Sequence, residues 1–208
     1  GADGWRPAGD GGRVTPLAPP GQYTVLLTAG GQELRGPLTV LKDPSSAGSE
    51  ADILAQTQVI LQLREETNAV VDLINEAEEI RAQVVDLSEV LRGREGMGAI
   101  LAAGEALDAA LIDLEMGLTD LRLSGGSAGQ DALRWPRQLY AKLTSLAGYI
   151  GGSDFPPTTQ QLEVHERLQG LLREAQDRME AIRSSELQEI NGLLAAEGLP
   201  HVVGRAGG

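Results

Sequence analysis

Residues 50–91, EADILAQTQVILQLREETNAVVDLINEAEEIRAQVVDLSEVL, form a stretch of 42 residues that contains neither glycine nor proline. The preceding residues 1–48, in contrast, hold ten glycines and six prolines. Glycine and proline are the strongest breakers of regular structure, so this change marks the boundary between a turn-rich segment and a long helix. At about 1.5 Å per residue, residues 50–91 predict an uninterrupted helix roughly 60 Å long.

The apolar residues of this stretch recur at intervals of three and four. One line contains Ile53, Ile60, Leu63, Val70, Ile74, Ala77, Val84 and Leu91, and a second contains Val59, Leu73, Ile80 and Leu87. Two adjoining lines make a stripe that is wide enough to touch two neighbouring helices, which favours a bundle over a two-stranded coiled coil. At the start, Ser49 and Asp52 have the spacing of a capping box.

The rest of the chain up to Pro200 also has helical patterns. We expect a second helix over about 99–123, a third over about 131–150 with Pro136 in its first turns, and a last one over about 158–197. Glycine-rich or proline-rich segments separate them. The lengths alternate as long, short, short, long, so the first and last helices are expected to pair along their full length.

The segment before the long helix predicts a β-hairpin. Residues 22–28 and 34–41 are rich in β-branched, aromatic and apolar side chains, and the glycines of Ala29-Gly30-Gly31-Gln32 suit a tight turn. Pro37 indicates an edge position or a bulge. Two strands alone are marginally stable in water, so they need further strands from residues 5–17 or a surface on which to pack.

These patterns predict a mainly α fold: an elongated antiparallel bundle of three to four helices with a small N-terminal antiparallel β segment. The expected organisation is a Gly/Pro-rich arm with the β segment over residues 1–43, a linker over 44–48, the bundle over 49–200 and a flexible tail over 201–208. The chain begins with glycine and shows no signal-peptide pattern, which fits a processed or truncated chain.

Composition excludes several classes of function. Without cysteine, the chain forms no disulfide, thiolate metal site or cysteine nucleophile. The formal net charge of −13 argues against nucleic-acid binding, which needs a basic face. The chain contains no run of eighteen or more apolar residues, so the sequence predicts no membrane span.

No group of residues predicts catalysis, a metal site or a cofactor site. His165 lacks the spaced partners of a metal centre, and we expect it to be structural or exposed. The many helix carboxylates favour a solvated face over an acid–base pair. Arg81 lies on the inward side of the first helix, where a cation needs a carboxylate partner. We therefore expect a protein that is not an enzyme.

The few aromatic side chains are candidates for contacts with a partner. Trp5 lies among glycines and prolines, and Phe155 and Pro156 occupy a loop between helices. Together with Tyr23 and Leu38 of the β segment, they are the predicted contact residues. Trp135, Tyr140 and Tyr149 are expected to be core or cap residues of the third helix.

The order of these segments resembles the C-terminal region of sortilin-like, BNR-repeat "glycosyl hydrolase" type secreted bacterial proteins, over roughly residues 20–202. The residues that carry the resemblance are Pro20 to Val25, Pro37 to Val40, Asp43-Pro44, Trp135 to Leu139, Asp154, Pro157, Thr158, Gln160, Leu187 to Leu194 and Gly198-Leu199-Pro200. In that family, β-propellers precede an immunoglobulin-like segment and a helical tail. The propellers and any residue for glycoside chemistry are absent here.

The resemblance implies an extracytoplasmic location and a partial immunoglobulin-like sheet that another chain completes. With the missing catalytic motifs, it predicts a non-catalytic structural or adaptor protein that contacts other protein chains in a larger extracytoplasmic assembly. Two alternatives remain open: an accessory subunit on the periplasmic face of a membrane complex, such as a photosynthetic or secretion assembly, and a detached C-terminal module of a propeller-type hydrolase.

Overall fold

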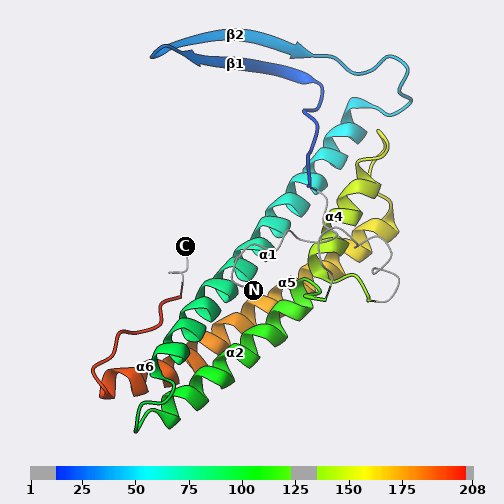
Figure 1. Cartoon of the computed structure of the whole chain (residues 1–208). Coiled ribbons are helices and arrows are strands. Elements are labelled where there is room, and N and C mark those ends of the chain that lie inside the picture. Colours follow the sequence, from blue (N-terminus) through cyan, green and yellow to red (C-terminus); the bar gives the residue numbers. More distant parts are fainter. Residues whose placement is uncertain (1–12, 123–134, 205–208) are drawn as a thin grey trace.

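The computed structural model describes residues 13–122 and 135–204, which form an elongated helical bundle and a projecting two-stranded hairpin (Figure 1). The predicted mainly α fold with a small N-terminal antiparallel sheet is confirmed. The elements in chain order are β1 (Gly21–Ala29), β2 (Gln32–Val40), α1 (Glu50–Leu91), α2 (Gly98–Leu118), α4 (Leu139–Ile150), α5 (Thr159–Ser184) and α6 (Glu186–Ala196).

The long helix α1 begins and ends as its sequence predicts. The Ser49 hydroxyl accepts a hydrogen bond from the Asp52 amide at 3.1 Å, and the Asp52 carboxylate accepts one from the Ser49 amide at 2.9 Å. Two free amides of the first turn are thereby satisfied in a capping box. After Leu91, Gly93 adopts a φ of 84°, which a residue with a side chain rarely adopts, and the helix ends.

The helices are arranged as three parallel rods. One rod is α1; the second is α2 followed by α4, which pack against different parts of α1; the third is α5 followed by α6 (Figure 1). The α6 helix packs on α2 and α5, so the expected pairing of the first and last helices ends with α5. The core contributed by α1 contains Ile60, Leu63, Val70, Leu73, Ala77, Ile80, Val84 and Leu91, which lie on the predicted apolar lines.

The second helix is shorter than predicted. It ends at Leu118 rather than near residue 123, and Thr119 is extended, with φ −145° and ψ 142°. Asp120 then accepts a hydrogen bond from the Arg122 amide at 3.0 Å. A side-chain acceptor two residues before a backbone donor offers the chain a turn in place of the helix.

The third helix also starts later than predicted, at Leu139, and Pro136 precedes it instead of lying in its first turns. Gln138 is extended at the helix start. The part of the prediction that covers 131–134 lies outside the described residues. A proline disfavours helical geometry in the residue before it, so Pro136 keeps Trp135 out of the helix, which begins only after the proline.

The last predicted helix is interrupted at Ser185, whose φ of −115° and ψ of −88° separate α5 from α6. At the end of α5, the Ser184 hydroxyl donates to the carbonyl oxygens of Glu180 and Ala181 at 2.9 and 3.1 Å. Serine hydroxyls that bond to the preceding turn compete with the helical ladder and bend helices. The hydrogen bonds of Ser184 therefore favour a break at this point.

Residues 201–204 do not form the predicted flexible tail. Val202 is buried, its amide donates to the Asn191 side chain at 2.8 Å, and its carbonyl accepts from the same side chain at 2.9 Å. Gln83 of α1 bonds both backbone groups of Val203 in the same way, at 2.8 and 2.9 Å. This segment is fastened to α6 and α1, because two amide side chains satisfy its backbone; residues 205–208 lie outside the described residues.

Candidate functional site

Several exposed apolar side chains lie together on the hairpin. Strands β1 and β2 pair antiparallel in one continuous register from Gly21 opposite Val40 to Ala29 opposite Gln32, without a bulge. Gly30 and Gly31 form the turn with φ values of 55° and 77°. Both values are positive, as a tight two-residue hairpin turn requires, so the predicted turn is confirmed.

One face of the hairpin is apolar and open to solvent. Side chains that lie opposite each other across the strands share a face, and this face alternates with a more polar one. We call it the hairpin apolar face, and it consists of Tyr23, Val25, Leu27, Leu34, Leu38 and Val40. Four of its side chains are exposed by 49% at Val25, 55% at Leu27, 62% at Leu34 and 46% at Leu38.

No helix of the described residues packs on either strand, and the hairpin extends away from the bundle (Figure 1). Apolar side chains gain free energy when they leave water, at about 25 cal/mol per Å² of buried surface. Several large apolar side chains side by side on an uncovered sheet are therefore a typical contact surface.

The linker that follows the hairpin is held by its own polar groups. Lys42 donates to the Ser46 carbonyl at 2.6 Å, and Asp43 accepts from the Ser45 amide at 2.8 Å. Gly48 is buried against the backbone of Asp154, where a β-carbon would overlap the Asp154 carbonyl oxygen. The linker is thus packed at Gly48 against the loop between α4 and α5.

Two further contacts hold the α4–α5 loop and the segment before β1 against the bundle. Gln56 of α1 donates to the carbonyl oxygens of Ile150, at 2.7 Å, and Ser153, which fixes the same α4–α5 loop. On the other side of the hairpin, Val14 packs against the hydrophobic core. The hairpin is therefore attached to the bundle both before β1 and after β2.

The structure brings together two of the five predicted contact residues. Tyr23 and Leu38 lie directly opposite each other on the hairpin apolar face. Tyr23 is half-buried, and its hydroxyl donates to the Pro19 carbonyl at 2.6 Å. Phe155 and Pro156 are exposed in the α4–α5 loop beside the linker, not on the hairpin. Trp5 lies outside the described residues.

The sequence did not single out the other large residues of the hairpin apolar face. Val25, Leu27 and Leu34 are as exposed as Leu38. The alternation of the two strands, combined with the two-residue turn, contained the signal: it fixes which side chains share a face. The prediction relied mainly on aromatic side chains, and Leu38 was the one aliphatic residue of this face that it included.

The aromatic residues expected in the core of the third helix have three different environments. Tyr140 is half-buried and packs against the core. Tyr149 is exposed, contrary to expectation, because it lies on the solvent side of α4. Trp135 precedes the helix and stacks on the Arg122 guanidinium, whose carbon lies 3.5 Å from the ring centre.

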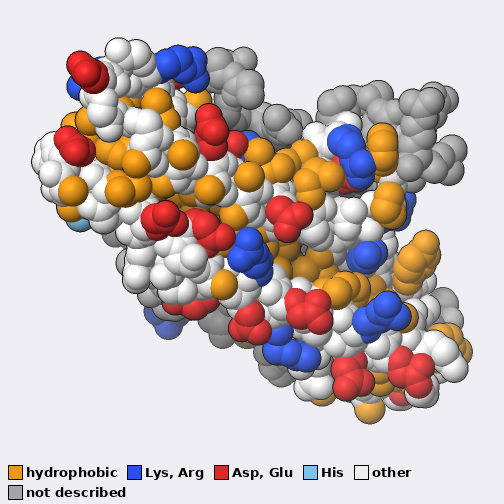
Figure 2. Space-filling model, turned by 90° about the horizontal axis from the view of Figure 1, so that it is seen from below, with side chains coloured by type: hydrophobic (Ala, Val, Ile, Leu, Met, Phe, Trp, Pro, Cys, Tyr) orange, Lys and Arg blue, Asp and Glu red, His pale blue; other side chains and the backbone are white. Residues whose placement is uncertain are grey.

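A second apolar surface lies at the other end of the bundle. Figure 2 shows hydrophobic side chains gathered toward the end of the molecule where α2 and α6 lie. The exposed residues of α2 include four alanines, namely Ala99, Ala102, Ala106 and Ala109. An alanine offers a single methyl group, so this surface presents much less apolar area per residue than the leucines of the hairpin.

Two arginines of the bundle are paired with carboxylates of another helix. Arg81 of α1 bonds Asp108 at 2.8 Å and Glu115 at 3.0 Å, both on α2, which confirms that this inward cation has carboxylate partners. Burial lowers the pKa of Arg81, but the hydrogen bonds and negative charges of Asp108 and Glu115 outweigh it and raise the pKa overall. The Glu115 side chain is only 1% exposed. Such pairs fix the alignment of neighbouring helices.

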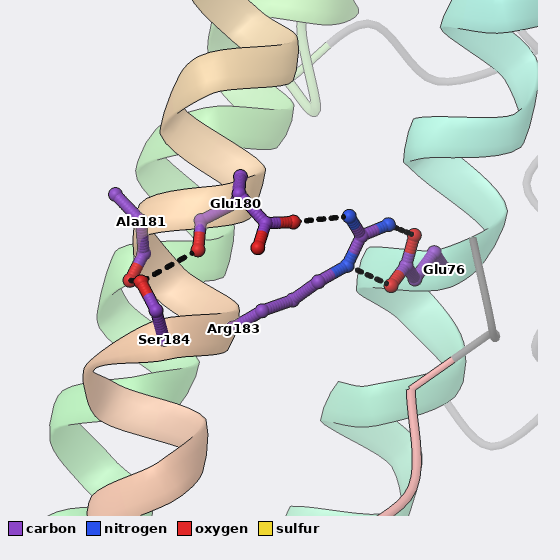
Figure 3. A network of polar contacts seen from close by, with 5 residues as sticks. All are labelled: Glu76, Glu180, Ala181, Arg183 and Ser184. Atoms are coloured by element: carbon purple, nitrogen blue, oxygen red, sulfur yellow. Dashed lines mark hydrogen bonds and ion pairs between the residues drawn. The ribbon is translucent and has the colours of Figure 1, made fainter.

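A second inter-helix pair joins α5 to α1 (Figure 3). Arg183 bonds both carboxylate oxygens of Glu76, and it also bonds Glu180 at 2.9 Å. The hydrogen bonds to Glu76 are the main cause that raises the pKa of Arg183. Glu76 and Glu180 thus neutralise the Arg183 cation, and the role of this contact is structural.

The buried histidine also has a structural environment. His165 of α5 is buried, and its Nε2 atom lies 2.8 and 2.9 Å from the two carboxylate oxygens of Glu66 on α1. Gln169 donates to the same carboxylate at 2.7 Å. The expectation of a structural or exposed histidine is met by this inter-helix contact. Among the described residues, no group of three or more histidine, aspartate or glutamate side chains is arranged to hold a metal ion.

No helix in the described parts of the chain is both long and apolar enough to cross a bilayer. No family model matches this chain, and no solved structure matches it.

Proposed function

We propose that this protein is a non-catalytic adaptor that binds another protein chain through the hairpin apolar face. The observation that carries the proposal is the exposure of Val25, Leu27, Leu34 and Leu38, each near or above one half, on one side of a two-stranded sheet. A hairpin of two strands is marginally stable in water without a surface against which to pack. A partner that covers this face stabilises the hairpin and the complex together.

The attachment of the hairpin supports this role. The linker is bonded internally through Lys42 and Asp43, and Gly48 packs against the α4–α5 loop. A binding element that is presented in a set direction loses less conformational freedom when a partner binds, and this raises the affinity. The roughly 60 Å bundle then serves as a spacer that separates the contact from the other end of the protein.

The charge distribution gives independent support. The hairpin, residues 21–40, contains one acidic and one basic side chain, Glu33 and Arg35, which pair with each other at 2.7 Å, while the whole chain carries a net charge of −13. Charged residues are depleted at the centres of protein interfaces. The hairpin is therefore the part of the described surface where a partner meets little repulsion.

The setting that we propose is a larger extracytoplasmic assembly. It rests on the resemblance of the chain to the tails of secreted bacterial propeller proteins. Fractionation of the source cells tests it: we expect the protein in the periplasmic or secreted fraction, and recovery in the cytoplasmic fraction alone contradicts the setting.

The contact surface is tested with a matched pair of variants. Leu38→Asp places a charge on the hairpin apolar face, and Leu54→Asp places the same charge at an equally exposed position of α1. Tagged wild-type protein and both variants are purified under native conditions from the source organism, and any accompanying protein is produced separately and titrated against each purified chain.

We expect a partner that binds the wild type and Leu54→Asp with similar affinity and Leu38→Asp at least about tenfold more weakly, since a buried unpaired charge is costly. Circular dichroism provides the control that all three proteins remain helical. A partner that binds Leu38→Asp as tightly as the wild type, or a wild-type chain that is always recovered alone, contradicts the proposal.

A further inference from the structure

The two outer edges of the hairpin differ in their capacity to accept another strand. Opposite residues in an antiparallel pair alternate between those that exchange hydrogen bonds and those that do not. Thr24 lies opposite Pro37, which has no N–H, and the two-residue turn assigns this pair to the second kind. The backbone groups of Pro37 and of every second residue of β2 therefore point to the outer edge of that strand.

The outer edge of β2 is protected. Its outward-facing residues are Glu33, Arg35, Pro37 and Thr39, so that it carries an ion pair and lacks one donor. Charged side chains and proline are the features with which proteins prevent further pairing at a sheet edge.

The outer edge of β1 has neither of these features. Its outward-facing residues are Gln22, Thr24, Leu26 and Thr28, none of which is charged, and each supplies an N–H and a C=O. Backbone groups of this kind need hydrogen-bond partners when they leave water. The β1 edge thus offers a complete ladder, while the β2 edge does not.

The side chains of β1 also indicate an inner strand. Val25, Leu26 and Leu27 follow one another, and Leu26 is 53% exposed on the face opposite the hairpin apolar face. Strands with one buried face alternate apolar and polar residues, whereas a continuous apolar run is typical of a strand that is covered on both faces.

The hairpin apolar face is small for a contact on its own, and an added strand would enlarge it. Two nine-residue strands cover about 30 Å by 10 Å, or about 300 Å² in projection. A stable protein–protein interface buries about 800 Å² on each partner. Strand pairing adds main-chain hydrogen bonds and extends the sheet that the partner covers.

We propose that the outer edge of β1 receives a β-strand from a partner protein, an uncharged strand with an apolar side chain at every second residue, and that the same partner supplies the layer over the hairpin apolar face. This inference rests on the proposed function and specifies its partner. The partner is β-rich, and the hairpin becomes two strands of its sheet.

A second copy of this chain does not satisfy both requirements. Two β1 strands can pair with each other without charge repulsion, because neither contains a charged residue. The resulting four-stranded sheet still exposes its apolar face, since both copies contribute the same face and no covering layer. A sheet needs a second layer to bury that face.

The probe for the edge is a short synthetic peptide of alternating threonine and valine with a lysine at each end, and its control is the same peptide methylated on alternate backbone nitrogens. Binding to the full chain is followed by NMR. The matched variants are Thr24→Pro on the β1 edge and Thr39→Pro on the β2 edge, which remove one outward N–H each from opposite sides of the same hairpin.

We expect the unmethylated peptide to bind the wild type and Thr39→Pro equally and to protect the outward amides of β1 from hydrogen exchange. Thr24→Pro should weaken it by at least about tenfold, and the methylated peptide should not bind. If the inward β1 amides of Thr24→Pro are no longer protected from hydrogen exchange, the proline has disrupted the hairpin. In that case Thr28→Lys is used in place of Thr24→Pro, with Thr39→Lys as its control, because a lysine opposes pairing at a sheet edge.

Several results overturn the inference. They are peptide binding that Thr24→Pro leaves unchanged, a wild type that binds no peptide, and outward β1 amides that are already protected in the wild type alone. A dimer of the chain that Thr24→Pro dissociates, measured by sedimentation, assigns the edge to a second copy instead. The proposed function is judged separately by Leu38→Asp, which alters the face and leaves the edge backbone intact.

Discussion

Arg183 of α5 holds the Glu76 carboxylate of α1 with two hydrogen bonds, of 2.8 Å from Nε and 2.5 Å from Nη2. Glu76 is buried, and the pair lies two residues before the break between α5 and α6. A planar guanidinium that meets a carboxylate in this way fixes both distance and orientation. The contact therefore sets the position of α5 against α1 at the point where the third rod bends.

We predict that Glu76→Gln lowers the free energy of unfolding by about 2 kcal/mol, because the hydrogen bonds to a charged partner are lost inside the bundle. Urea denaturation followed by circular dichroism measures it. Glu65→Gln is the matched control, since Glu65 pairs with Arg64 on the exposed surface of α1, where a change below about 0.5 kcal/mol is expected. Equal effects of the two substitutions would contradict the structural role of the buried pair.

The amino-acid pattern predicted the long helix and its core closely. A stretch without glycine or proline, a capping box at Ser49 and two apolar lines are local features, and each acts within a few residues. The carboxylate partner of Arg81 was also predictable, because a cation on an inward face requires one. Which carboxylates on α2 provide it depends on the alignment of the two helices, and the single helix does not contain that information.

Two of the errors involve polar side chains that form hydrogen bonds with the backbone. Leu118 and Leu121 continue the leucine spacing of α2, so the periodicity extended the helix past Asp120, whose side chain instead captures the Arg122 amide. The Val202 segment was predicted to be part of a flexible tail after Pro200. Asn191 and Gln83 hold it from distant elements.

The candidate site was predictable in part. Tyr23 and Leu38 were identified from residue type and location, and the register places them opposite each other. The difference between the two edges required the register itself, because shifting one strand by a single residue reverses which side chains share a face. Phe155 was expected to be an equivalent contact, but it lies in a loop that does not touch the hairpin apolar face.

We predict that Gly48→Ala destabilises the protein by about 2 kcal/mol and loosens the linker, because the new β-carbon overlaps the Asp154 carbonyl oxygen. Urea denaturation measures the stability, and NMR relaxation measures the mobility of residues 41–49. The matched control is Gly170→Ala in α5, where a β-carbon meets no atom. That substitution should stabilise the protein by about 0.5–1 kcal/mol through helix propensity. A linker that remains rigid in Gly48→Ala would contradict the role of this contact.

The pKa of Asp120 provides a test of the structure at the end of α2. Hydrogen bonds from the Arg122 side chain are the main cause that lowers this pKa from its usual value of 3.8. A group whose pKa is lower in the folded state stabilises the protein above its unfolded pKa, and this contribution is lost as the pH falls through the folded pKa. We therefore predict that Arg122→Met raises the pKa of Asp120 and removes part of the stability at neutral pH.

NMR titration of the aspartate carboxyl carbons measures this change, and Asp52 is the internal control. The low pKa of Asp52 is due mainly to the hydrogen bond with the Ser49 hydroxyl and should be the same in both proteins. Arg122→Lys keeps the charge without the two-pronged geometry and should give an intermediate pKa for Asp120. An unchanged Asp120 pKa in Arg122→Met would show that the ion pair does not form in solution.

The segment after α6 is predicted to open in a defined order. Asn191 holds Val202, whose side chain is buried, and Gln83 holds Val203, whose side chain is exposed. Gln83→Ala should therefore remove the protection of the Val203 amide from hydrogen exchange and leave Val202 protected. Asn191→Ala should expose both amides, because Val203 stays in place only while Val202 is anchored, and it should lower the stability by about 1–2 kcal/mol. Exchange measured by NMR distinguishes the two variants. If Gln83→Ala removes the hydrogen-exchange protection of both amides, the two contacts instead form as one cooperative unit.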